Sequence, residues 1–66
     1  MQTLLRYMSQ HELDKAKGKP CTFSVVRDGQ RVERAGRLGR VTLNIVWVGA
    51  FCYSRDEVAD MLVEVD

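Results

Sequence analysis

Few side chains in this 66-residue sequence are of the kinds that perform catalysis or hold a metal ion. The one histidine, His11, lies at the start of a predicted helix beside Glu12, where a solvated imidazole on the helix surface is the ordinary role. A zinc site needs ligands in close pairs, and His11 with the separated Cys21 and Cys52 does not supply them. We therefore expect no metal, no cofactor and no enzymatic activity.

The arginines are the most informative residues. Segment 27–40 contains five arginines and two acidic residues, so its net charge is +3. The arginines are Arg27, Arg31, Arg34, Arg37 and Arg40. Guanidinium groups bind phosphate and carboxylate equally well. Either these arginines form a binding face, or they pair with cross-strand neighbours and with the acidic segment 54–66. No aromatic residue lies between Phe23 and Trp47, which argues against nucleic-acid binding.

The elements that position these arginines begin with a short helix. Ser9-Gln10-His11-Glu12 matches a capping box, in which serine and glutamate side chains bond each other's backbone amides. Gly18 is a plausible C-terminal stop, and Pro20 prevents continuation. Residues 1–7 fit a helix start or a short strand equally well.

A β-hairpin is predicted next. Cys21, Phe23 and Val25 alternate with polar residues, the pattern of a half-buried strand. Asp28-Gly29 is a strong turn signal, because glycine accepts the positive φ of a tight turn. The return strand runs over residues 30–35.

Beyond this hairpin, Gly36 and Gly39 indicate a bulge or a second turn. The following strand is then expected to place one apolar set on the core face: Val41, Leu43, Ile45 and Trp47. Val46 and Val48 fall on its opposite face, so the strand is apolar on both sides. Either both sides are covered within the domain, or Val46 and Val48 meet a partner.

The C-terminal part is expected to hold a short strand over residues 50–53 and a second capping box at Ser54-Arg55-Asp56-Glu57. The apolar residues that follow fit a helix or a strand. We favour one helical turn over residues 55–60 and then a strand over residues 61–65.

The predicted fold is a single mainly β domain, residues 1–66. A short N-terminal helix precedes a small four- to five-stranded antiparallel barrel of the SH3 or Sm-like type. The alternative is an α+β fold, with a C-terminal helix packed on a β-meander.

The run FSVVRDGQRV at residues 23–32 resembles the Sm-like family, which includes bacterial RNA chaperones. That family has an apolar strand, an Asn/Asp-Gly turn and a second strand here, and residues 53–58 loosely match its closing motif. The family's second-strand glycine would fall near Arg34, whereas this chain has Gly36. Its usual aspartate after that strand and its RNA-contacting motif are absent. The resemblance therefore implies the fold, and not the RNA site.

Hydropathy and net charge limit the location and the classes of function that we expect. No apolar stretch approaches the roughly 20 residues of a membrane span, and the N-terminus lacks a signal-peptide pattern. We therefore expect a cytoplasmic protein with reduced, structural cysteines. The function we predict is a protein-binding regulator, adaptor or inhibitor, of the kind found among accessory proteins of phages and mobile elements. It would self-associate or form a stable hetero-complex. The alternative is an RNA- or DNA-binding barrel, against which the net charge of +1 counts.

Overall fold

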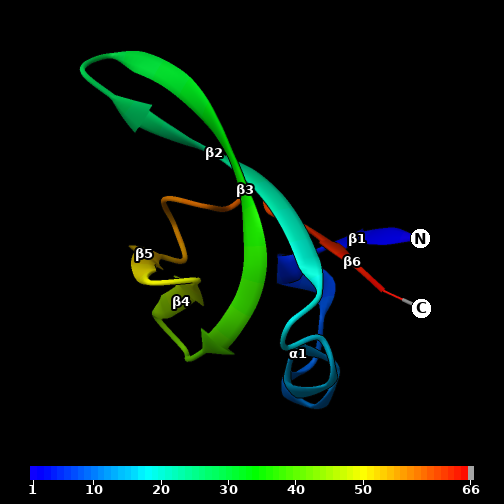
Figure 1. Cartoon of the computed structure of the whole chain (residues 1–66). Coiled ribbons are helices and arrows are strands. Elements are labelled where there is room, and N and C mark those ends of the chain that lie inside the picture. The colour runs from blue at the N-terminus through cyan, green and yellow to red at the C-terminus, as the bar shows by residue number, and fades with distance from the viewer. Residues whose placement is uncertain (66) are drawn as a thin grey trace.

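The computed structural model describes residues 1–65, and Asp66, counted above in the acidic segment, lies outside them. Figure 1 shows the elements along the chain. Six strands and two short helical elements are formed: β1 (Gln2–Leu4), η1 (Leu5–Tyr7), α1 (Gln10–Lys15), β2 (Pro20–Arg27), β3 (Gln30–Val41), β4 (Ile45–Val48), β5 (Phe51–Ser54) and β6 (Leu62–Glu64).

The helix α1 carries the expected capping box. The Glu12 amide donates to Ser9 Oγ at 3.2 Å, and the Ser9 amide donates to a Glu12 carboxylate oxygen at 3.0 Å. The chain does not open on this helix, because β1 and η1 precede it. Within the described part of the chain, no helix is long and apolar enough to cross a membrane.

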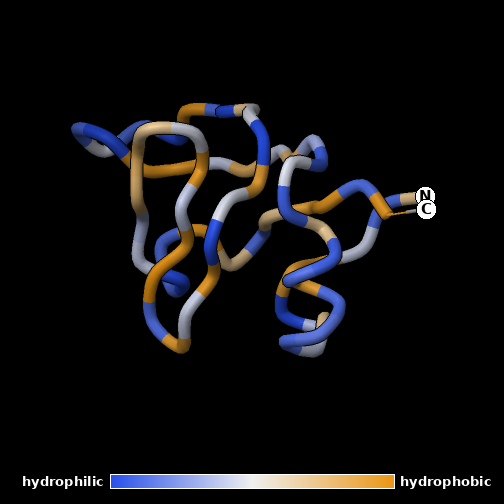
Figure 2. The backbone as a smooth tube through the Cα atoms, turned by 60° about the horizontal axis from the view of Figure 1, so that its bottom comes forward, coloured by the Kyte–Doolittle hydropathy of each residue, from blue (hydrophilic) through white to orange (hydrophobic). Residues whose placement is uncertain are grey.

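All six strands pair antiparallel in one sheet, in the order β1-β6-β2-β3-β4-β5. The order ends at β1 and β5, so the sheet is open and the expected closure into a barrel is not found. Figures 1 and 2 both show the two termini side by side. There the Val65 amide donates to the Met1 carbonyl at 2.7 Å. The final segment forms strand β6, so the prediction of a strand rather than a C-terminal helix is confirmed.

The hairpin of β2 and β3 turns at the predicted residues, Asp28 with φ 53° and Gly29 with φ 76°. Strand β3 then runs on as one strand through both glycines expected to mark a bulge or a turn, and its register with β4 shifts between Leu38 and Val41. A Cβ atom on Gly39 would lie 3.1 Å from the Trp47 carbonyl oxygen. The absence of a side chain at Gly39 therefore allows the backbone of β4 to lie close to β3 where their register shifts.

The predicted core face is correct only at Val41, which is buried, and it is wrong for Leu43, Ile45 and Trp47, which are exposed in segment 41–47. The chain reverses within it, since the Thr42 amide donates to the Ile45 carbonyl at 2.8 Å, with Leu43 and Asn44 between them. This turn separates β3 from β4 and resets the alternation of side chains. The buried residues are consequently Val46 and Val48, which line the core instead of meeting a partner.

The core is a single cluster beneath the curved sheet. It joins η1 and α1 to the inner faces of the strands and to the turn before β6: Leu5, Met8, Leu13, Ala16, Cys21, Phe23, Val25, Leu38, Val41, Val46, Val48, Val58, Met61 and Val63. Strand β3 contributes to both halves of the sheet, pairing with β2 along its first part and with β4 at its end. The β4–β5 hairpin is therefore carried on the far end of β3 (Figure 1).

Candidate interaction surface

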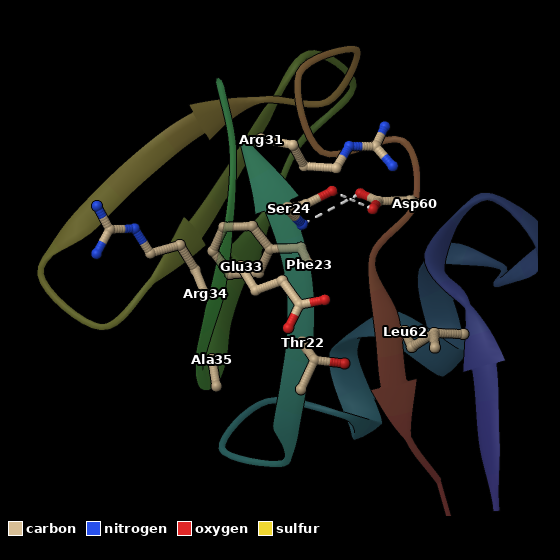
Figure 3. A pocket seen from close by; sticks show the side chains of 9 residues that line it. All are labelled: Thr22, Phe23, Ser24, Arg31, Glu33, Arg34, Ala35, Asp60 and Leu62. Carbon is tan, nitrogen blue, oxygen red and sulfur yellow. Dashed lines mark hydrogen bonds between the residues drawn. The ribbon is translucent and has the colours of Figure 1, made fainter. Parts of the chain in front are cut away.

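The arginines predicted to form a binding face divide between the two faces of the β2–β3 hairpin. Arg34 stands opposite Phe23, on the side of the hairpin that faces the core, and Arg27 shares this side. Arg31 stands opposite Val26, on the outer side. Figure 3 shows Arg31 and Arg34 pointing in opposite directions. One common face of arginines is therefore not formed.

Two of these arginines meet the acidic segment that follows β5. Arg27 Nη1 lies 3.2 Å from a Glu57 carboxylate oxygen. Arg31 points toward Asp60 (Figure 3), and its charge helps to lower the pKa of that carboxyl. Pairing of the hairpin with the acidic segment, one of the two alternatives above, is thus found at one ion pair, Arg27–Glu57, whereas Arg31 acts on Asp60 only through its charge.

The other arginines of this segment differ in their contacts. Arg37 Nη1 donates to the Gly18 carbonyl at 2.8 Å, which ties the turn after α1 to β3. The side chains of Arg34 and Arg40 make no hydrogen bond or ion pair within residues 1–65. Arg34 is the one of these two that lines a groove, described below.

Ser24 and Asp60 form the main polar contact between β2 and the acidic segment (Figure 3). The Ser24 hydroxyl donates to Asp60 Oδ2, and the Ser24 amide lies 3.4 Å from Oδ1. The hydroxyl's hydrogen bond is the main cause that lowers the pKa of Asp60. Strand β6 pairs with β2 only at Cys21 and Thr22. The Ser24 amide, the next one on β2 that faces away from β3, therefore meets the Asp60 carboxylate instead of a neighbouring strand. This is a structural role for Asp60.

The β4–β5 hairpin exposes a group of large apolar side chains. Ile45 and Trp47 lie on its outer face, with 36% and 41% of their surfaces exposed, and Leu43 is 83% exposed at the turn before β4. Phe51, at the other end of the hairpin, is 69% exposed, but it pairs with Val48 and therefore lies on the inner side, away from Trp47. The whole segment 41–53 has no charged residue. The longest uncharged stretch of the chain thus includes this surface hairpin. We call the exposed side chains of Leu43, Ile45 and Trp47 the apolar patch.

Strand β5 also leaves backbone groups unpaired. It bonds to β4 alone and forms one end of the sheet. Its sequence, Phe-Cys-Tyr-Ser, holds none of the charged residues or prolines that commonly keep an edge strand from pairing. Within residues 1–65, no other strand adds to this edge.

A groove of about 580 Å³ lies between β5 and the inner side of the β2–β3 hairpin. Phe23 and Tyr53 meet edge to face there, with ring centroids 5.0 Å apart. Arg27, Arg34 and Phe51 also line it. Sequence reasoning missed this groove, because Phe51 and Tyr53 come from β5, which is distant in sequence from the hairpin of Arg27 and Arg34 and is brought to it by the curvature of the sheet. We call it the arginine–aromatic groove.

The two cysteines differ in their surroundings. Cys21 is buried, and burial raises the pKa of its thiol. Cys52, also expected to be a buried structural residue, is exposed on the outer face of β5 opposite Trp47. It was placed correctly in a strand but on the wrong side of it. Both thiols are free in the structure.

Comparisons with protein-family models, with curated proteins and with solved structures find no match to this chain. The features of the molecule that suit binding are the apolar patch, the free edge of β5 and the groove beside it.

Proposed function

We propose that this protein is a non-enzymatic interaction module that binds a protein partner through the β4–β5 hairpin and so acts as a regulator, adaptor or inhibitor. The observation that carries the proposal is the uncharged hairpin itself. It exposes Leu43, Ile45 and Trp47, and Phe51 on its inner side, although the small core has few apolar residues to spare. Contiguous exposed apolar groups on a soluble domain are typical of protein interfaces, and tryptophan is enriched among the residues that dominate binding energy.

Charge supports a protein partner over a nucleic acid. Phosphate-backbone binding ordinarily needs a strongly basic face. Here the arginines are divided between two faces, Arg27 is already paired with Glu57, and Arg31 points toward Asp60 (Figure 3). The net charge of +1 is equally weak for a nucleic-acid binder.

The test is affinity purification of the tagged protein from lysate of its source, with and without nuclease. We expect one protein to co-purify in both conditions. Ile45→Ser combined with Trp47→Ser should release it. Val26→Ser is the matched control, because Val26 is 60% exposed on the outer face of the other hairpin, away from the patch. Loss of the partner upon nuclease treatment, or its retention by the double variant, would contradict the proposal.

Single-stranded nucleic acid is a second candidate, and one observation favours it. The groove places Phe51 and Tyr53 beside Arg27 and Arg34, and aromatic rings with basic groups form stacking sites for bases. The Sm-like resemblance, itself a proposal, is supported by the Asp28-Gly29 turn and the bent β3. We propose closure of the barrel only as part of that resemblance. A steep fall of oligonucleotide affinity with salt would identify this second function.

Cytoplasmic location is part of the same proposal, and so is self-association if the partner is a second copy. Light scattering over a range of concentrations tests self-association. A monomer at every concentration would leave a hetero-complex as the form in which the apolar patch is covered.

A further inference from the structure

We propose that the partner binds as an extended acidic segment, which adds as a strand to the free edge of β5 and places a carboxylate on Arg34 in the arginine–aromatic groove. This inference rests on the proposed function and names the chemistry of the partner. The added strand and its carboxylate would form a second part of the interface beside the apolar patch, and this part would fix the orientation of the partner segment.

The β4–β5 turn determines which backbone groups of β5 face the free edge. Val48 and Phe51 pair across the two-residue turn Gly49-Ala50, where Gly49 has φ 59°. The pair that closes a two-residue turn is hydrogen-bonded, and bonded pairs alternate along an antiparallel ladder. The next residue, Cys52, therefore directs its amide and carbonyl away from β4, toward the free edge. An added strand finds a donor and an acceptor there.

The side chains of the groove suit such a strand. Every second residue of an extended segment points to the same side, and that side would meet the rings of Phe23 and Tyr53. Phe51 stands 69% exposed at the entrance, where it can cover an apolar residue of the segment. A groove of about 580 Å³ holds several side chains.

The positive charge in the groove favours a ligand that carries a negative charge. Arg27 is already paired with Glu57 at 3.2 Å, whereas Arg34 has no acidic partner within residues 1–65. The neighbours of Arg34 along β3 are Glu33 and Ala35, whose side chains alternate to the other face of the hairpin. One unpaired guanidinium is thus left in the groove, and a carboxylate is the group that binds its planar fork in two places.

One unpaired arginine also decides between an acidic peptide and a nucleic acid. A single-stranded nucleic acid presents a phosphate at every nucleotide and is bound by several basic groups along its backbone. The groove offers one arginine free of an ion pair, together with a strand edge that pairs with peptide backbone. Both features match an acidic peptide better.

The experiment uses the whole protein and three synthetic peptides of alternating valine and threonine, which differ only in a central aspartate, asparagine or lysine. Titrations are followed by backbone amide NMR. We expect the aspartate peptide to bind about tenfold more tightly than the asparagine peptide, as one charged contact implies. Its binding should shift the amides of Cys52 and Arg34 most.

Variants separate the two parts of the interaction. Arg34→Ala should abolish the preference for aspartate, whereas Arg40→Ala, on the same strand outside the groove, should leave it unchanged. Cys52→Pro removes the outward amide without removing a bond to β4, so it should weaken all three peptides. Cys52→Ser keeps the amide and should not weaken them.

Equal binding of the three peptides, absence of binding, or a preference that survives Arg34→Ala would overturn the inference. So would amide shifts centred on Ser24 and Asp60, on the outer side of the hairpin. A single-stranded oligonucleotide that displaces the aspartate peptide and binds more tightly would also overturn it. If the peptides fail while Ile45→Ser combined with Trp47→Ser still releases the co-purified partner, the inference fails and the proposed function stands.

Discussion

The stabilities of two alanine variants, Val46→Ala and Leu43→Ala, should rank opposite to the sizes of the side chains removed. Val46 is 0% exposed, whereas the larger Leu43 is 83% exposed. Val46→Ala removes two buried methyl groups, at about 0.8 kcal/mol for each carbon, and adds a cavity term. We expect a loss of about 2–3 kcal/mol. Leu43→Ala should cost less than about 0.5 kcal/mol, as surface substitutions do.

These magnitudes are large for so short a chain. At about 0.05–0.15 kcal/mol per residue, a domain of this length has roughly 3–10 kcal/mol of stability in total. Urea unfolding followed by circular dichroism measures both variants against the wild type. We expect an unchanged slope, a clearly lower midpoint for Val46→Ala and a melting temperature lower by about 10–20 °C. If Leu43→Ala lost as much stability as Val46→Ala, the turn at residues 42–45 and the assignment of faces would be refuted.

Three further outcomes are expected. Gly39→Ala should destabilise the domain by about 1–3 kcal/mol, because the added Cβ would press on the backbone of β4 at 3.1 Å; an unchanged urea midpoint would show that the strands separate freely. The pKa of Asp60 is lowered by the Ser24 hydroxyl, so its carboxylate stabilises the fold above the ordinary pKa, and this contribution disappears as the pH falls through the lowered value. Melting temperatures between about pH 6 and pH 3 should therefore fall less in Asp60→Asn and Ser24→Ala than in the wild type, and parallel profiles would speak against the contact. A thiol reagent should modify Cys52 rapidly in the folded protein and Cys21 only after unfolding, because Cys21 is buried and its pKa is raised; Cys52→Ser should remove the rapid phase, and its persistence would place Cys21 at the surface.

Local signals in the sequence located the elements whose causes are local. The Asp28-Gly29 turn forms where it was predicted, because both residues adopt the positive φ that such a turn requires. The capping box at Ser9 and Glu12 forms for the same kind of reason, since its hydrogen bonds close within one turn of helix. In both cases the information lies within four residues.

The reversal at residues 42–45 was missed because it has no glycine or proline at its centre. The Thr42 hydroxyl accepts a hydrogen bond from the Ile45 amide at 3.1 Å, and the Arg55 guanidinium donates to the Thr42 carbonyl. The second of these contacts depends on the folded chain, so it leaves little trace in the local pattern. Unbroken apolar alternation across the turn then indicated a single strand and exchanged the buried and exposed faces.

The candidate site could be predicted only in part. The arginines were recognised as a group, but side chains on one hairpin alternate between its faces, and the exact register decides which of them share a surface. Arg34 lies opposite Phe23 through the register of the hairpin, but Tyr53 joins them only through the curvature of the sheet, which brings its ring against Phe23. Such long-range contacts depend on the tertiary fold, which periodicity does not describe.

The most direct test of the central claim is photo-crosslinking inside the source cells, with a photoreactive phenylalanine analogue placed at Trp47 or, as a control, at Val26. The two positions are exposed on different hairpins. We predict one discrete protein crosslink from position 47, resistant to nuclease, and none of the same size from position 26. A nuclease-sensitive crosslink at position 47, or a protein crosslink from position 26 alone, would contradict binding of a protein partner through the β4–β5 hairpin.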